Sequence, residues 1–380
     1  MTTTITAQEN ETPSLQGPAA SFTPGSAVPP GRRDTTALVL FQSFLCNPSE
    51  ERAALSNVIL LWEQIPRYTG DRLNRQGDLP NELITDFEVS GQPFQLSITP
   101  GTYRAKHKGV HRAVRRFPGI REQAVEQALI QVATDQAQCA EENGKTQYYV
   151  YFSLRQLAER LKMMGSSMSH AQIREALEVL NSAMMGLTVS DAKSKMTERT
   201  PIIPLFRQRI SEQDEANGTD AWVVSLHPII NHAIRNVTYR QFPIRELKNY
   251  RPFGSHLVRR MFWQCPNISP SHPFTFSMEA LAQETPGLDH TRLSSKLKAL
   301  EGELEKMLKD GLITHYDVDV QYAKTGNGRP AMVDAVMTLY PGERWVKAVK
   351  SASKRLTLSE QSLGLPRSQR SMRQQSLPLG

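Results

Sequence analysis

The sequence contains an internal repeat, and this duplication strongly limits the folds open to the chain. The stretch "YFSLRQLAER" at 151–160 corresponds to "TFSMEALAQE" at 275–284, and "SHAQIREALEVL" at 169–180 corresponds to "DHTRLSSKLKAL" at 289–300. The first two stretches start 124 residues apart (151 to 275) and the second two 120 (169 to 289), a difference of a few loop residues. The repeat predicts a duplicated supersecondary unit.

Each copy has the features of a short strand, two helices joined by a turn, and a β-hairpin. Two S-x-x-Q capping boxes mark helix starts in the first copy: Ser153 with Gln156, and Ser169 with Gln172. A longer helix is expected before each unit, at about 121–136 and 244–263. This order is typical of a winged helix. The sequence therefore predicts an α+β fold with two tandem winged-helix domains.

Composition sets the expected limits of these domains. The first 36 residues are rich in Thr, Ser, Pro and Gly, and the last residues in Ser, Gln and Arg, so both ends are expected to be disordered. An amphipathic helix is expected at 50–65. The predicted division is a disordered tail at 1–36, an N-terminal extension at 37–89, winged-helix domains at 90–242 and 243–345, and a basic flexible tail at 346–380.

Cysteine usage and hydropathy indicate a cytoplasmic protein without a membrane segment. Cys46, Cys139 and Cys265 lie far apart and form no CxxC pair. Mean hydropathy is −0.44, no apolar run approaches the ~20 residues needed to span a bilayer, and no secretory signal is visible. A net charge of +7 with pI about 9.3 favours polyanionic partners.

The second helix of the later unit has the features of a DNA-recognition helix. Asp289 is expected to cap it, and leucines at helical spacing form its buried face. No acid follows Asp289 until Glu301, and Glu303 and Glu305 lie in the later turns. Small and basic side chains at the start of a helix suit insertion into a major groove; the alternative is an ordinary solvated helix face. The candidate DNA contacts are Thr291, Arg292, Ser295, Lys296 and Lys298.

The equivalent helix of the earlier unit is a weaker candidate. Gln172 and Arg174 are candidate contacts, but Glu175 and Glu178 beside them would repel phosphates. This helix is therefore expected to support backbone contacts or self-association.

Two further basic segments are candidate phosphate contacts. The stretch 102–121 carries seven cations and no acid. The candidates are Arg104, Lys106, Lys108, Arg112, Arg115 and Arg116 there, and Lys324 and Arg329 beside the tip of the last hairpin.

No catalytic residue, metal ligand or cofactor is expected. The Gly-Lys-Thr at 144–146 lacks the earlier glycine of a phosphate-binding loop, since Cys139 stands there, and no strand is expected before it. His227 and His232 are too isolated for a metal pair. Tyr148, Tyr149 and Tyr151 indicate core packing rather than a nicking tyrosine.

Longer stretches resemble a known family. "PFQLSITPGTYRAKHKGVHRAVRRFPGIREQAVEQAL", "FSLRQLAERL" and "MSHAQIREALEVL" resemble plasmid-encoded RepA-type replication initiators. "YRQFPIRELKNYRPFGSHLVRRMF" and "DHTRLSSKLKALEGELEKMLKDGLI" are similar to TrfA-type initiators. The resemblance covers about residues 90–340.

The resemblance implies a function as well as a fold. Such proteins bind direct repeats (iterons) in double-stranded plasmid origin DNA, promote opening of an adjacent AT-rich region, and recruit the host replication initiator and the replicative helicase. Homodimers are implied as well. Carried over, Thr291, Arg292, Ser295 and Lys298 are base and phosphate contacts. A winged-helix transcriptional regulator without a replication role is the alternative, and a DNA-nicking enzyme a third.

Overall fold

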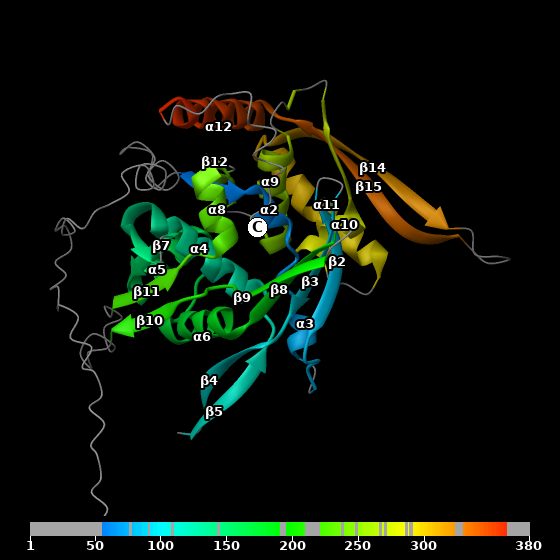
Figure 1. The fold of residues 1–380 in the computed structure, drawn as a ribbon. Coiled ribbons are helices and arrows are strands. Elements are labelled where there is room, and N and C mark those ends of the chain that lie inside the picture. The colour runs from blue at the N-terminus through cyan, green and yellow to red at the C-terminus, as the bar shows by residue number, and fades with distance from the viewer. Residues whose placement is uncertain are drawn as a thin grey trace, which may run out of the picture. The chain divides into compact units, whose positions relative to one another are not determined.

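The computed structural model describes most of the chain after residue 54 (Figure 1). The described residues are 55–75, 78–89, 92–107, 110–142, 145–190, 195–209, 221–236, 239–247, 250–265, 268–269, 272–285, 288, 292–323 and 330–362. The tail predicted at 1–36 lies outside them. Within them the protein is α+β, with helices and several small sheets.

The first copy of the repeated unit follows the predicted order of elements. It comprises α4 (Ile120–Gln136), β6 (Ala137–Glu142), β7 (Lys145–Phe152), α5 (Leu154–Met163), α6 (His170–Ser182), β8 (Met184–Ser190) and β9 (Lys195–Pro201). Both capping boxes are present, because the side chains of Ser153 and Ser169 accept hydrogen bonds from the backbone N–H of Gln156 and Gln172. Both predicted helix starts are confirmed.

Further strands surround this copy. They are β2 (Leu83–Val89), β3 (Gln92–Ile98), β4 (Gly101–His107) and β5 (Val110–Arg116) before it, and β10 (Phe206–Arg209), β11 (Ala221–Ser225) and the helix α8 (Pro228–Asn236) after it. One sheet has the order β2-β3-β8-β9 and another the order β10-β11-β7-β6, while β4 and β5 form a two-stranded sheet among the described strands.

The second copy has the same order of elements. It comprises α9 (Pro252–Gln264), β13 (Phe274–Ser277), α10 (Met278–Glu284), α11 (Leu293–Lys309), β14 (Ile313–Ala323) and β15 (Ala331–Pro341). The strands form one sheet in the order β13-β15-β14. Gly311, at φ +68°, follows the end of α11 in the left-handed conformation that terminates many helices.

The two copies differ in how their strands pair. In the second copy β13 pairs with β15, a strand of its own hairpin. In the first copy the equivalent strand β7 pairs with β11, and the β8–β9 hairpin pairs with β3. Leu96 and Ile98 of β3 lie opposite Leu187 and Met185 of β8, and all four side chains are buried. Apolar pairing with β3 therefore takes the place of pairing with β7.

Buried side chains form two hydrophobic cores. The first core contains side chains of α4, α5, α6, β3, β7 and β11, and the second those of α9, α10, α11, β13 and β15. The first core also includes Ile59, Trp62 and Ile65, which composition had placed in a separate extension.

The helix predicted at 50–65 is wrong for Leu55–Ile59 and is confirmed only for Leu60–Gln64. Leu55–Ile59 form the strand β1, which pairs antiparallel with β12 (Tyr239–Pro243), and a short helix α2 covers Leu60–Gln64. The β-branched Val58 and Ile59 suit a strand. The partner strand lies far along the chain, so local periodicity does not show the pairing.

The single helix predicted at 244–263 is interrupted. A 3₁₀ turn, η2, covers Ile244–Leu247, and α9 begins at Pro252. Proline has no backbone N–H and disfavours helical geometry in the residue before it, so it starts a helix here and does not continue one.

The flexible tail predicted from 346 is wrong as far as residue 362. The chain forms the helix α12 (Glu343–Ser362) there, with Trp345, Val349, Ala352 and Leu356 buried. Their spacing of three and four residues gives an apolar stripe. Trp345 and Val349 belong to the second core and Leu356 to the first, so α12 packs against both. Residues 363–380 lie outside the described chain.

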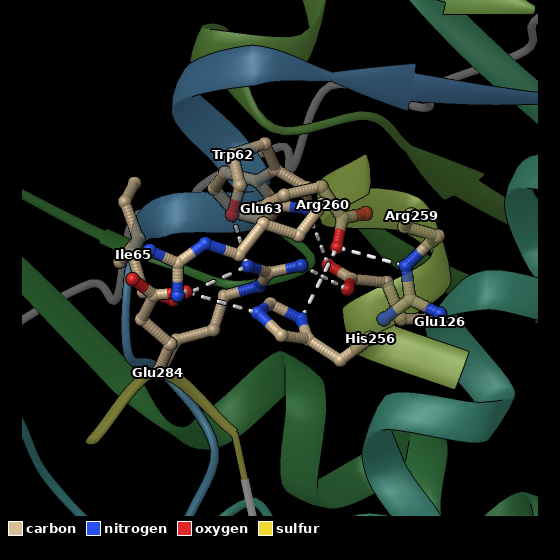
Figure 2. A network of polar contacts seen from close by, with 9 residues as sticks. Trp62, Glu63, Ile65, Glu126, His256, Arg259, Arg260 and Glu284 are labelled. Atoms are coloured by element: carbon tan, nitrogen blue, oxygen red, sulfur yellow. Dashed lines mark hydrogen bonds and ion pairs between the residues drawn. The ribbon is translucent and has the colours of Figure 1, made fainter. Parts of the chain in front are cut away.

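Buried charges also join the two cores (Figure 2). The carboxylate of Glu63 on α2 lies 2.9 Å from Arg259 Nε and 3.8 Å from His256 Nδ1, both on α9. His256 Nε2 lies 3.3 Å from Glu284 of α10, which also pairs with Arg260 at 2.9 Å. Carboxylates and basic groups therefore alternate through this cluster.

A second buried pair anchors the same segment to α4. Arg67 Nη2 lies 2.6 Å from Glu126 Oε2, and the Trp62 indole N–H donates to Glu126 Oε1 at 2.9 Å. The Arg67 guanidinium also donates to the backbone carbonyl of Trp62 and lies over its ring. The segment from Trp62 to Arg67 thus holds α4 of the first copy through one buried pair and α9 of the second through another.

His227, next to this segment, predicts a specific pH dependence of stability. Burial, and then the charge of Arg67, lower the pKa of its imidazole from 6.5 to about 3. Below pH 6.5 the unfolded chain therefore binds a proton here that the folded protein does not, and the free energy of unfolding falls by up to about 1.4 kcal/mol per pH unit.

The substitution His227→Asn tests this. His227 Nδ1 accepts from the Ile229 N–H at 3.2 Å at the start of α8, and asparagine also accepts such a bond. We expect the variant to lose less stability than the wild type between pH 6.5 and pH 4, measured by urea unfolding at each pH. Equal slopes in the two proteins would contradict the assignment.

Candidate nucleic-acid interface

The first turn of α11 is exposed and cationic. The side chains of Arg292, Ser294, Ser295 and Lys298 are exposed, whereas Leu300, Leu304 and Met307 are buried in the second core. No acidic residue lies in this first turn. Among the described residues, the side chains of Arg292 and Lys298 form no ion pair. This end of the helix offers small side chains and two cations to the solvent.

The start of α11 differs from the sequence prediction. The residue preceding the helix is Arg292, with extended backbone and no capping hydrogen bond from its side chain, and not Asp289. Leu293 and Leu297 are only partly buried. Asp289, His290 and Thr291 lie outside the described residues. Within the described part of the chain, no side chain caps the backbone N–H groups of this first turn, and these groups add to the positive end of the helix dipole.

Lys296 has a different role from its neighbours. Its ammonium lies 3.0 Å from both carboxylate oxygens of Glu279 on α10, and its side chain is only 13% exposed. This pair connects the two helices of the turn. We therefore assign Lys296 to the orientation of α11 and not to direct contact with a ligand.

The acidic residues of α11 lie in its later turns as expected, and one of them, Glu303, is buried. Its side chain is 2% exposed, pairs with Lys306 at 2.7 Å, and accepts from the Arg251 N–H at 3.0 Å. Glu305 is exposed and accepts from the Tyr316 hydroxyl at 2.9 Å. Glu303 therefore fixes α11 to the residue that precedes α9.

Polar side chains of α6 have interaction partners within the protein. Gln172 completes the capping box at Ser169, and the Arg174 guanidinium lies 5.9 Å from the ring centroid of Trp222. Glu175 pairs with Arg121 at 2.8 Å, and Glu178 accepts from the Arg104 backbone N–H at 2.9 Å. The two carboxylates expected to repel phosphate are thus partners of the basic stretch itself.

That basic stretch forms the β4–β5 hairpin and the start of α4. The side chains of Arg104, Arg112 and Arg115 are exposed, and Arg115 donates to Asn81 at 3.2 Å. Lys106 lies in β4. Lys108 lies outside the described residues.

Two arginines at the base of the hairpin are held internally. Arg116 lies 3.7 Å from the buried carboxylate of Glu122, and Arg121 pairs with Glu122 and Glu175. Burial would lower the pKa of Arg121, but the two carboxylates raise it above its ordinary value. Arg121 therefore stays charged and connects α4 with α6.

The tip of the β14–β15 hairpin carries Lys324 and Arg329, which lie outside the described residues. The hairpin that leads to it has eleven residues in each strand. Its inner face contributes Ala335, Met337 and Leu339 to the second core, and Tyr322 near the tip is 62% exposed.

The Gly-Lys-Thr and tyrosine motifs, which were rejected as catalytic sites from the sequence, lie in or beside strands. A strand, β6, does precede the Gly-Lys-Thr at 144–146, contrary to expectation, but the strand β7 follows it. A phosphate-binding loop needs a helix there. Tyr148 and Tyr149 of β7 are buried.

No group of three or more His, Cys, Asp or Glu that could hold a metal occurs among the described residues. None of the described helices is long and apolar enough to cross a membrane.

The exposed cations of α11 and of the β4–β5 hairpin make these two surfaces the candidate interface.

The comparisons with known proteins add little to this geometry. No family model matches the chain, and no curated protein matches it. Solved structures of domains 2 and 3 of RctB are similar to it. The selenomethionine derivative has a TM-score of 0.43 and 11% identity, covering 74% of this chain and 97% of the other. A second structure of these domains has a TM-score of 0.42 and 12% identity, covering 75% and 99%. Similarity at this level supports no argument about function.

Proposed function

We propose that the chain is a replication initiator that binds direct repeats in double-stranded plasmid origin DNA through two winged-helix domains. The observation that carries the DNA-binding part is the first turn of α11, where Arg292 and Lys298 are exposed beside small side chains. Cations and small residues at a helix start suit contact with guanine acceptors and phosphates in a major groove.

The arrangement around α11 supports a winged helix in the second copy. Helix α9, strand β13, helices α10 and α11, and the β14–β15 hairpin follow in the order of that fold, and the three strands form one sheet. The first copy has the same order but pairs its strands differently. We assign it to the same fold as a variant.

The initiator role rests on the resemblance of the sequence to RepA-type and TrfA-type initiators. In this proposal, several copies bound side by side promote opening of the AT-rich region, and the energy comes from binding and bending DNA. The host replication initiator and helicase are then recruited. No catalytic step is assigned to the chain.

A binding assay separates the proposal from the regulator alternative. The protein is titrated onto one duplex with direct repeats next to an AT-rich segment and one with a palindromic operator, and permanganate then probes unpaired thymines. We expect protection of the repeats and reactive thymines in the AT-rich segment on supercoiled DNA. Protection of the palindrome alone would favour the regulator, and nicking of supercoiled DNA with Mg²⁺ would contradict the non-enzymatic assignment.

A further inference from the structure

The helix α6 occupies the place of a recognition helix in the first copy, yet strand β4 lies against its later turns. Thr102 of β4 donates its backbone N–H to Ser182 Oγ at 2.7 Å, and this hydroxyl lies 3.0 Å from the Thr102 carbonyl. The Arg104 N–H donates to Glu178 at 2.9 Å. A side chain at Gly101 would collide with the backbone of Val179. The C-terminal part of α6 therefore supports strand β4.

The β4–β5 hairpin that α6 supports has one exposed, cationic face. Thr102 pairs with Arg115 and Arg104 with Ala113, and directly opposed residues of an antiparallel pair point to the same face. His111 belongs to this face as well, because alternate residues of a strand share a face. The described side chains of this face, Thr102, Arg104, His111, Ala113 and Arg115, are all exposed. No acidic residue occurs between Gly101 and Arg116.

The opposite face of the hairpin turns toward the protein at its base. Tyr103, Val114 and Arg116 are partly buried, and Tyr103 lies under Arg121 at 5.7 Å. Arg112 also belongs to this face, but it lies nearer the tip and is exposed. The hairpin thus has an anchored base and a free outer part (Figure 1).

We propose that the β4–β5 hairpin enters the major groove of the bound DNA as a two-stranded ribbon, with the face of Arg104 and Arg115 toward the bases and flanking phosphates. This inference rests on the proposed function and assigns the DNA contact of the first copy to the ribbon, with α6 as its support. A two-stranded ribbon fits the major groove, about 12 Å wide, and not the minor groove, about 6 Å wide. Alternate residues on one strand lie roughly 6.7 Å apart, close to two base-pair steps of about 6.8 Å.

The test compares the proposed contact face with cations elsewhere on the surface. Arg104→Ala/Arg115→Ala removes two charges from the contact face, and Lys162→Ala/Lys309→Ala removes two exposed lysines from the ends of α5 and α11. On direct-repeat DNA we expect the arginine variant to bind about 10- to 100-fold more weakly, with a salt slope smaller by about two. Guanine N7 positions under the ribbon should also lose their protection from methylation. The lysine variant should keep both the affinity and the protection.

Variants of the support make the test independent of side chains that touch DNA. Glu178→Ala/Ser182→Ala removes two bonds to β4 and should reduce protection under the ribbon while protection under α11 stays. The single variant Glu178→Gln keeps Ser182 and retains an acceptor for the Arg104 N–H. It should therefore keep the protection under the ribbon that Glu178→Ala/Ser182→Ala loses. Thermal melting of each variant checks that it is folded.

The outcomes separate this inference from the proposed function. If the wild-type protein does not protect direct repeats, the proposed function fails, and the inference fails with it. If the wild type does protect them and Arg104→Ala/Arg115→Ala binds with unchanged affinity, salt slope and methylation pattern, only the ribbon assignment is overturned. Equal losses in Lys162→Ala/Lys309→Ala and in the arginine variant would also overturn the ribbon assignment.

Discussion

The variant Arg292→Ala/Lys298→Ala is expected to lose sequence-specific binding to direct-repeat DNA by at least about 100-fold while it keeps its fold. Each well-placed contact to a base is worth about 1–3 kcal/mol of discrimination. Both side chains are exposed on α11 and form no ion pair among the described residues, so their removal leaves the second core intact. The measurement is a titration of the specific duplex and of a scrambled duplex at the same salt concentration.

A matched control removes two lysines from other exposed positions. Lys162 at the end of α5 and Lys309 at the far end of α11 are both exposed. The double variant Lys162→Ala/Lys309→Ala has the same change in net charge and should retain the ratio of specific to non-specific affinity. If Arg292→Ala/Lys298→Ala stays within about threefold of the wild type on the specific duplex, α11 is not the recognition helix.

Glu63→Gln is expected to lower the free energy of unfolding by about 3–5 kcal/mol, because it leaves Arg259 buried without a carboxylate. The side chains of Glu63 and Arg259 are 8% and 3% exposed. Burial by itself would raise the pKa of Glu63, but Arg259, Arg67 and His256 lower it below 4.5. The ionised carboxylate therefore contributes stability at neutral pH that is lost as the pH falls through its pKa in the folded protein.

The free energy of unfolding of Glu63→Gln is measured in urea and compared with that of two further variants. Glu159→Gln breaks an exposed ion pair, in which the side chains of Arg155 and Glu159 are 69% and 63% exposed. This variant should lower the free energy of unfolding by no more than about 0.5 kcal/mol. Glu63→Met/Arg259→Met replaces the buried pair by apolar side chains and should recover most of the lost stability. A loss below about 1 kcal/mol in Glu63→Gln would show that the pair does not join the two copies energetically.

Much of the local structure was predictable from the sequence. The capping boxes at Ser153 and Ser169 set two helix starts, and the apolar spacing of Leu300 and Leu304 set the buried face of α11. The exposure of Arg292 and Lys298 follows from the same periodicity. Lys296 was grouped with them because periodicity does not show that Glu279 of α10 lies within 3.0 Å.

The segment before the first copy shows where local reasoning stops. Val58 and Ile59 were placed in an amphipathic helix, but they form a strand because β12 supplies hydrogen-bond partners. The helical stripe of α12 was missed because the tail was assigned from the Ser-, Gln- and Arg-rich composition of the last residues, although Trp345, Val349, Ala352 and Leu356 are spaced to form one apolar face. A tail rich in charge still folds when such a face finds a core.

By itself the sequence determined the order of strand, helix pair and hairpin in each copy, the helix starts at Ser153 and Ser169, and the cationic first turn of α11, because these depend on residues within a few positions of one another. Only the tertiary structure decided that β7 pairs with β11, that β4 lies against α6, and that Glu63 reaches Arg259. Those contacts join segments far apart in the chain. Their free energy comes from pairing and burial, which no local pattern of residues specifies.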